Sequence, residues 1–179
     1  METGNEKNCP LPVPVHIPAD GESGCFWEDR KDRHHCGIDL YAEKGTPVFA
    51  IEEGEVVEIE IMTSPSMIEY WNKTYHIIVR GNSGIYYKYG EMDMTIPEKG
   101  SRVKKYDRIG EVGQVLNPEM IDTTSPRYIQ ALKEKNPAML HLEIWEEYPV
   151  TDHKLYMGGN WFGSKKPPGL LDPLHYLHK

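Results

Sequence analysis

The sequence predicts a mainly β protein: a single-domain antiparallel β-sandwich or barrel with one short helical insertion. Short segments rich in Val, Ile and Tyr recur between residues 38 and 145, which is typical of strands. Turns that contain glycine separate these segments at short intervals, as in sandwiches and barrels. The 179 residues, of which 39% are hydrophobic, are enough for one globular domain with a core.

The elements can be placed in order along the chain. Residues 1–32 are expected to form an extended arm and loop, because four prolines within residues 10–18 fix φ and lack an amide donor. Expected strands cover residues 38–42, 47–51, 55–61, 75–80, 85–89, 107–113 and 138–145, with a short piece at Val103. Expected turns cover residues 43–46, 52–54, 81–84 and 97–100.

Residues 117–135 interrupt the strand pattern. Pro126 is suited to the start of a helix that continues through Glu134. We expect these residues to form an insertion that covers a sheet edge or a cleft. The domain is expected to span residues 33–179, with a loop-rich tail from residue 146.

Charge and composition exclude some classes of function. The formal net charge of −8, without a dominant basic patch, argues against nucleic-acid or anionic-membrane binding. No apolar run reaches membrane-spanning length, and the polar, acidic start does not predict a signal peptide. The chain is expected to be either cytoplasmic or an exported protein without its leader. Cys9, Cys25 and Cys36 are expected to be thiols, with a Cys9–Cys25 or Cys25–Cys36 bridge as the alternative.

His35 and Asp39 are the first candidate metal ligands. If the backbone is extended here, alternate side chains face the same way, so both would share a face with Gly37 between them. An imidazole and a carboxylate placed in this way could bind zinc. A surface histidine and a turn aspartate are the alternative, because this spacing is common by chance.

The order of motifs resembles the lysostaphin/LytM-type zinc endopeptidases, which cut cross-links in bacterial peptidoglycan. The matching segments are Arg33-x-His35-x-Gly37-x-Asp39-Leu40, Gly45-Thr46-Pro47-Val48-x-Ala50, Gly54-x-Val56-Val57, residues 103–110, Leu140-His141-Leu142-Glu143-Ile144-Trp145 and Leu171-Asp172-Pro173. The resemblance implies the peptidoglycan endopeptidase fold, called a duplicated hybrid motif, and the extracytoplasmic location that is usual in the family.

The resemblance also implies a zinc site and two departures from it. His35, Asp39 and His141 occupy the three ligand positions, an arrangement that leaves a fourth position open, as in catalytic zinc sites. Met139 replaces the first histidine of the family's final His-x-His and is expected to be inert as a base. The family's Tyr-x-His-Leu segment, aligned on residues 87–90, places Tyr89 at the other catalytic histidine. Tyr89 is then a candidate oxyanion donor and a poor base, since a phenol titrates near pKa ~10.

These departures set the expected function. A lost general base costs ~10²–10⁴-fold in rate. We therefore expect a zinc-binding, non-catalytic or weakly active member that binds a peptide, a peptidoglycan-like glycan or a protein. The alternative is an active zinc endopeptidase with a non-standard base; Glu143 is a candidate, although it matches a glutamate of the family and is expected to be a structural partner.

A third alternative is a metal-free structural module. The segments Gly45-Thr46-Pro47-Val48 and Val103-Lys104-Lys105 also resemble lipoyl- or biotinyl-carrier barrels. Those carriers need a lysine at a hairpin tip, and the sequence has no matching motif.

Overall fold

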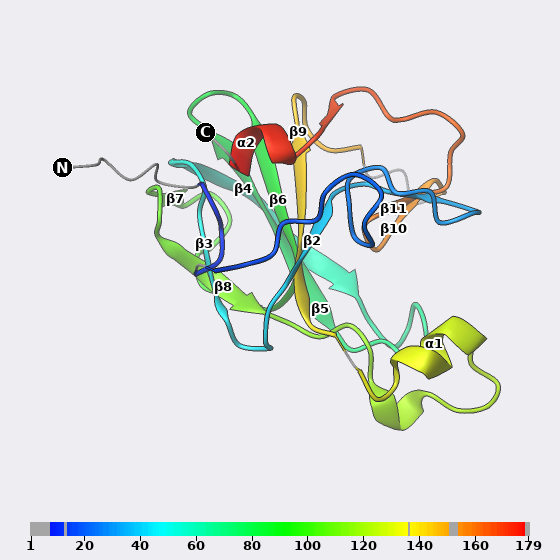
Figure 1. The fold of residues 1–179 in the computed structure, drawn as a ribbon. Coiled ribbons are helices and arrows are strands. Elements are labelled where there is room, and N and C mark those ends of the chain that lie inside the picture. Colours follow the sequence, from blue (N-terminus) through cyan, green and yellow to red (C-terminus); the bar gives the residue numbers. More distant parts are fainter. Residues whose placement is uncertain (1–7, 13, 136, 151–153, 178–179) are drawn as a thin grey trace.

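The computed structural model describes residues 8–12, 14–135, 137–150 and 154–177. Figure 1 shows its elements. The strands are β1 (His34–His35), β2 (Ile38–Tyr41), β3 (Pro47–Phe49), β4 (Gly54–Thr63), β5 (Thr74–Gly81), β6 (Tyr86–Thr95), β7 (Arg102–Val103), β8 (Arg108–Val112), β9 (Met139–Trp145), β10 (Tyr156–Met157), β11 (Asn160–Trp161) and β12 (Leu170–Leu171). The helices are η1 (Pro118–Met120), α1 (Arg127–Leu132) and α2 (Leu174–Leu177).

A large antiparallel sheet forms the body of the molecule. Its main path runs β12-β9-β6-β5-β4-β7, β2 pairs with β9, and β8 pairs with both β6 and β3. A small sheet of order β1-β11-β10 lies beside β2 (Figure 1). The prediction of a mainly β, antiparallel fold is confirmed; in the part of the chain that is described, the sheets do not close into a barrel.

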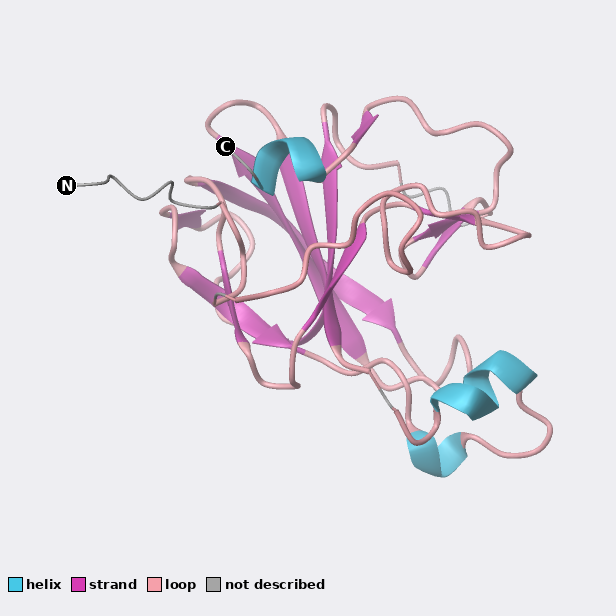
Figure 2. Ribbon diagram, in the orientation of Figure 1, coloured by secondary structure: helices cyan, strands magenta, loops and turns pink. Residues whose placement is uncertain are grey.

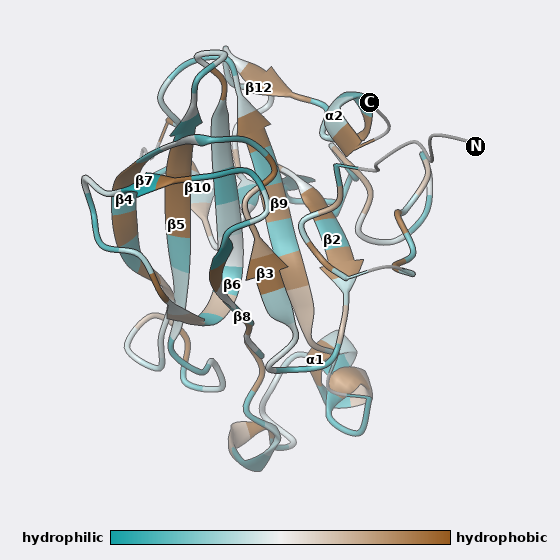
Figure 3. Ribbon diagram, turned by 90° about the vertical axis from the view of Figure 1, so that its left-hand side faces the viewer, coloured by the Kyte–Doolittle hydropathy of each residue, from teal (hydrophilic) through white to brown (hydrophobic). Residues whose placement is uncertain are grey.

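The two faces of the large sheet differ in chemistry. Side chains alternate between the faces of a strand, so Leu140, Leu142 and Ile144 of β9 enter the main core, while His141 and Glu143 face the other side. Figure 3 shows this alternation as brown and teal bands along β9. The register continues the pattern into β2, because Asp39 pairs directly with His141.

Several elements extend beyond the expected ones. The expected strand 85–89 continues to Thr95, because a bulge at Gly90–Glu91 absorbs an extra residue and pairing then resumes. Short strands β10, β11 and β12, with helix α2, occur in the tail that was expected to be loop-rich. Their brevity explains the difference, since two-residue strands leave no periodic signal.

The arm and the insertion both pack against the body. In the arm, Leu11 enters the main core, and the carbonyl of Pro10 accepts a hydrogen bond from Phe49 at 2.8 Å; residues 1–7 and 13 lie outside the described part. The expected helix within residues 117–135 is present as α1, at the lower right of Figure 1 and in cyan in Figure 2. Its Ile129 packs in a separate cluster with residues 116 and 121 and beside Trp71.

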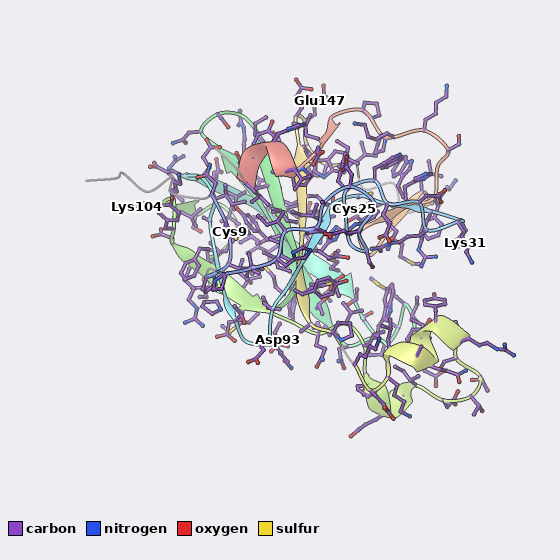
Figure 4. The ribbon with its side chains drawn as sticks, in the orientation of Figure 1. Cys9, Cys25, Lys31, Asp93, Lys104 and Glu147 are labelled. Carbon is purple, nitrogen blue, oxygen red and sulfur yellow. The ribbon has the colours of Figure 1, made fainter. Side chains whose placement is uncertain are left out.

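Two further expectations concern cysteines and membranes. Cys9, Cys25 and Cys36 are buried and form no disulfide among the described residues. Cys9 and Cys25 lie well apart in Figure 4. Within the described ranges, no helix combines the length and apolar character needed to cross a membrane.

Candidate metal centre

His35, Asp39 and His141 converge on one point beneath the small sheet. They come from β1, β2 and β9, and are only 1%, 5% and 1% exposed. His35 Nε2 lies 3.0 Å from His141 Nδ1, and Asp39 Oδ1 lies 3.1 Å from each of these two nitrogens. Three donor atoms, from two segments about a hundred residues apart, thus form a nearly equilateral triangle.

Hydrogen bonds on their far sides orient both imidazoles. His35 Nδ1 lies 2.8 Å from the carbonyl oxygen of Cys25, which can only accept, so Nδ1 carries a hydrogen, and Nε2 has a free lone pair when the ring is neutral. His141 Nε2 lies 2.9 Å from Glu143 Oε1 and donates to that carboxylate. When His141 is neutral, its Nδ1 lone pair therefore points into the triangle. Metal-binding histidines are commonly held in this way, by a hydrogen bond from the ring nitrogen that does not bind the metal.

A guanidinium orients the carboxylate in a similar way. Arg30 Nη2 contacts Asp39 Oδ2 at 3.2 Å, so the other oxygen, Oδ1, faces the two imidazoles. Arg30 is itself fixed by Glu28 at 2.9 Å and by Asn160 at 3.0 Å. Arg30 lies in a loop before β1, where neither periodicity nor a motif marks it, so it was not predicted from the sequence.

Glu143 is the centre of a second, buried group of polar side chains. Besides His141, it accepts hydrogen bonds from Trp145 Nε1 at 2.8 Å and from the Tyr156 hydroxyl at 2.5 Å. Lys88, only 1% exposed, donates to that hydroxyl at 2.6 Å, and its Nζ lies 3.9 Å from Glu143 Oε2. Glu143 thus has the structural role that was expected of it, and Lys88 supplies the balancing charge.

These contacts control the protonation of the cluster. Burial alone would lower the pKa of His141, but hydrogen bonds to Asp39 and Glu143 raise it to about 9. Burial would raise the pKa of Asp39, but the charge of His35 and its bonds to both histidines hold that pKa well below its usual range. The cluster therefore attracts a cation, and a bound metal would displace the His141 proton.

The donor set fits zinc. Two nitrogens and one carboxylate oxygen are ligands that zinc prefers, with bonds of ~2.0–2.2 Å. Tetrahedral ligands at such bond lengths are roughly 3.4 Å apart, so donor atoms at 3.0–3.1 Å would need to move by only a few tenths of an ångström. The three predicted ligand residues are therefore together, oriented and suited to the metal.

The two positions expected to have lost a catalytic histidine differ in placement. Met139 lies two residues before His141 on β9, hence on the same face, and it pairs with Tyr41. Tyr89 does not lie at the cluster: it is fully buried in the main core, where its hydroxyl accepts a hydrogen bond from the Ile51 amide at 2.9 Å. The structure thus gives Tyr89 no place as an oxyanion donor.

Glu91 is the residue of β6 that lies beside the cluster. Its partly exposed side chain follows Gly90, which pairs directly with His141. Burial raises the pKa of Glu91 to about 8, with the charge of Asp39 adding to this effect and that of His141 opposing it. The segment Tyr89-Gly90-Glu91-Met92 offers a second frame for Tyr-x-His-Leu, with an apolar residue at the fourth position, where the frame 87–90 has Gly90. An apolar residue at the fourth position was the signal available in the sequence.

Gly159 closes over His141, and a side chain there should disturb the cluster. A Cβ at Gly159 would lie 2.6 Å from His141 Nε2. We expect Gly159→Ala to lower zinc affinity about 10- to 100-fold, as the loss of hydrogen bonds that orient a ligand does. Calorimetric zinc titration measures the effect. Gly21→Ala is the matched control, because φ is +84° there and +80° at Gly159, but nothing lies within 4 Å. Equal affinities of the two variants would contradict this packing.

Known proteins resemble this chain in sequence and in fold. The model of peptidase family M23 matches residues 33–152. No curated protein matches. Among solved structures, the catalytic domain of the antimicrobial peptidase lysostaphin from Staphylococcus simulans is 19% identical, with a TM-score of 0.57 over 92% of this chain and 93% of that one. The chain spans 50% of a longer lysostaphin structure.

Two further structures share the fold. The catalytic domain of a mutant of the prophage-encoded M23 protein EnpA from Enterococcus faecalis is 20% identical, with a TM-score of 0.52 over 92% of this chain and 94% of that one. A zinc-containing peptidase from Vibrio cholerae is 21% identical, with a TM-score of 0.52 over 80% of this chain and 38% of that one. At these identities the likenesses show the fold alone.

Proposed function

Because this chain belongs to peptidase family M23, we propose that it binds one zinc ion through His35, Asp39 and His141 and hydrolyses peptide bonds in peptide or peptidoglycan-like substrates. The observation that carries the proposal is the triangle of donor atoms with sides of 3.0–3.1 Å. The lone pairs of His35 and His141 are directed into this triangle, because Cys25 and Glu143 bind the other ring nitrogens.

The surroundings of the triangle support a role on an extended substrate. Tyr41 lies two residues beyond Asp39 on the same face of β2. It lines an open depression of about 540 Å³ together with Lys44, Lys135 and Ala138. A peptide lying there would approach the cluster from the end of β2, where the ammonium groups of Lys135 and of Lys44, which is paired with Asp93 at 3.3 Å, could contact its carboxylates.

Each residue then has a defined task. Zinc held by the three ligands would polarise the scissile carbonyl and lower the pKa of water. His35 and His141 present lone pairs because Cys25 and Glu143 bind their other nitrogens. Arg30 holds Oδ2 of Asp39, so that Oδ1 faces inward. Burial of the cluster excludes bulk water, which strengthens each of these interactions.

A second candidate function is zinc-dependent binding without hydrolysis. Met139 favours it, because a thioether on the same strand face as His141 cannot accept a proton from water. In that case the protein would bind a peptide, a glycan or a protein partner at the same place, and substrates would be retained rather than cut.

One experiment distinguishes these functions. Purified protein should contain close to one zinc per chain and cleave glycine-rich peptides or isolated peptidoglycan, and a chelator should abolish the cleavage. Mass spectrometry of the products and elemental analysis give the two readouts. Zinc binding with substrate retention but no products would support the second candidate. Protein that takes up no zinc on titration would refute both.

A further inference from the structure

We propose that Glu91 is the general base of this site, taking the proton from the water that attacks the scissile carbonyl. This inference rests on the proposed peptidase function and assigns a residue to the step for which Met139 and Tyr89 are unsuited. It follows from the path of β6, the position of the Glu91 side chain and the surroundings of its carboxylate.

A β-bulge in β6 changes the direction of the Glu91 side chain. On β5, Ile77 pairs with Tyr89 and Tyr75 pairs with Met92, so the single residue between them opposes both Gly90 and Glu91. Such a bulge has one extra residue on one strand and redirects its side chain. Tyr89 and Met92 both point into the core, and Glu91 is thereby kept out of it.

The strand that pairs with β6 also changes at Glu91. β6 pairs with β9 up to Gly90, opposite His141, and pairs with β8 from Met92 onward. Glu91 therefore lies where β9 and β8 separate, next to the strand position of a proposed ligand. Asp93, two residues further along β6, is labelled in Figure 4 near the end of this strand and forms an ion pair with Lys44 of the depression.

The backbone of Glu91 is strained, and its neighbours hold it in that conformation. Glu91 has φ of +60°, a left-handed conformation that is strained for a residue with a Cβ. Its amide contacts Met62 Sδ at 3.2 Å, and its carbonyl accepts a hydrogen bond from Gly113 at 2.8 Å, so the conformation is fixed from two sides. Glycine would be the favoured residue here on conformational grounds alone.

The surroundings of the Glu91 carboxylate also suit a general base. Among the described residues, no donor is hydrogen-bonded to it, although Asp39, His141 and Arg30 are close enough to interact with its charge. It does not belong to the group whose ligand atoms all lie within 4.8 Å of one another, which comprises His35, Asp39 and His141. A carboxylate beside the ligands but outside their set is suited to accept a proton rather than to bind the metal.

The step balances without a further reactant. A Glu91 oxygen takes one proton from water as the water oxygen bonds to the scissile carbonyl carbon. The C–N bond then breaks, and the same proton passes to the leaving nitrogen. A carboxylate beside two histidine ligands serves as base in other zinc hydrolases on unrelated folds, so the chemistry has a physical precedent.

The experiment compares wild type, Glu91→Gln, Glu91→His and the exposed control Glu98→Gln. Glu91→Gln should bind zinc within about threefold of wild type, but its kcat should fall about 10²–10⁴-fold. Glu91→His, which restores an imidazole, should recover part of the lost rate, and Glu98→Gln should match wild type. Unchanged cleavage by Glu91→Gln would overturn the inference while leaving the proposed function intact. Loss of zinc would also overturn it, by making Glu91 a ligand.

Two readouts do not depend on cleavage. Acetohydroxamic acid must give up a proton when it binds zinc, so Glu91→Gln should bind it about 10- to 100-fold more weakly than wild type; equal affinity would contradict a base at position 91. In metal-free protein, Glu91→Gly should raise the Tm by about 2–4 °C, because it relieves the strained φ. A fall in Tm would indicate that Glu91 is retained for structure rather than for chemistry.

Discussion

His141→Ala should lower zinc affinity by more than about 100-fold and abolish any zinc-dependent cleavage. Loss of the hydrogen-bond partner of a ligand alone costs about 10- to 100-fold, and His141 contributes one of only three protein ligands. The substitution also removes the donor to Glu143 Oε1 at 2.9 Å, so that oxygen keeps the Tyr156 hydroxyl as its donor. Competition titration with a chromophoric chelator measures the affinity.

His16→Ala is the matched control for this prediction. His16 is an exposed histidine whose Nε2 lies 2.8 Å from Glu22 Oε2, with a side-chain exposure of 68%. The His16→Ala variant should bind zinc as the wild type does. If His141→Ala also retained wild-type zinc affinity, the metal would be bound elsewhere, and His35 and Asp39 would lose their proposed role as well.

Lys88→Met should cause the largest loss of stability. Removing one member of a buried charge pair costs about 3–5 kcal/mol, because the other charge remains in an apolar environment. Glu143 is fully buried and would keep its charge opposite the new thioether, with His141 as its remaining cationic partner. At about 2–4 °C per kcal/mol for a chain of this size, the Tm of metal-free protein should fall by roughly 10 °C, as measured by differential scanning calorimetry.

Lys99→Met, at an exposed turn position, provides the comparison and should leave the Tm within about 2 °C of wild type. The double variant Lys88→Met/Glu143→Leu should regain part of the loss, since replacing both charges removes the unpaired one. A Lys88→Met protein as stable as wild type would mean that the pair carries no such charge in the folded state.

The sequence predicted the fold and the ligand residues for physical reasons. Alternating apolar residues mark Ile38 to Tyr41 and Met139 to Trp145, and these strands pair so that Asp39 lies directly opposite His141. A period of two therefore indicated the strands and the shared face of His35 and Asp39, whereas His141 was predicted as a ligand from the resemblance to the family. The open sheets, rather than a barrel, follow from pairings between distant strands, which no local pattern encodes.

The rest of the site could not be predicted in this way. The expected strand ended at Tyr89, so the bulge at Gly90–Glu91 and the continuation of the strand to Thr95 were missed. Arg30 and Tyr156 come from loops and short strands, where only tertiary contacts bring them to Asp39 and Glu143. Lys88 is an ordinary residue of its strand until its burial is known.

A crystal structure of zinc-loaded protein, with anomalous data on both sides of the zinc absorption edge, tests the central claim most directly. We expect one anomalous peak per chain, ~2.0–2.2 Å from His35 Nε2, His141 Nδ1 and Asp39 Oδ1. A peak on any other set of side chains, such as Glu58, Glu60 and His76, would contradict the claim. So would the absence of a peak from crystals grown with excess zinc.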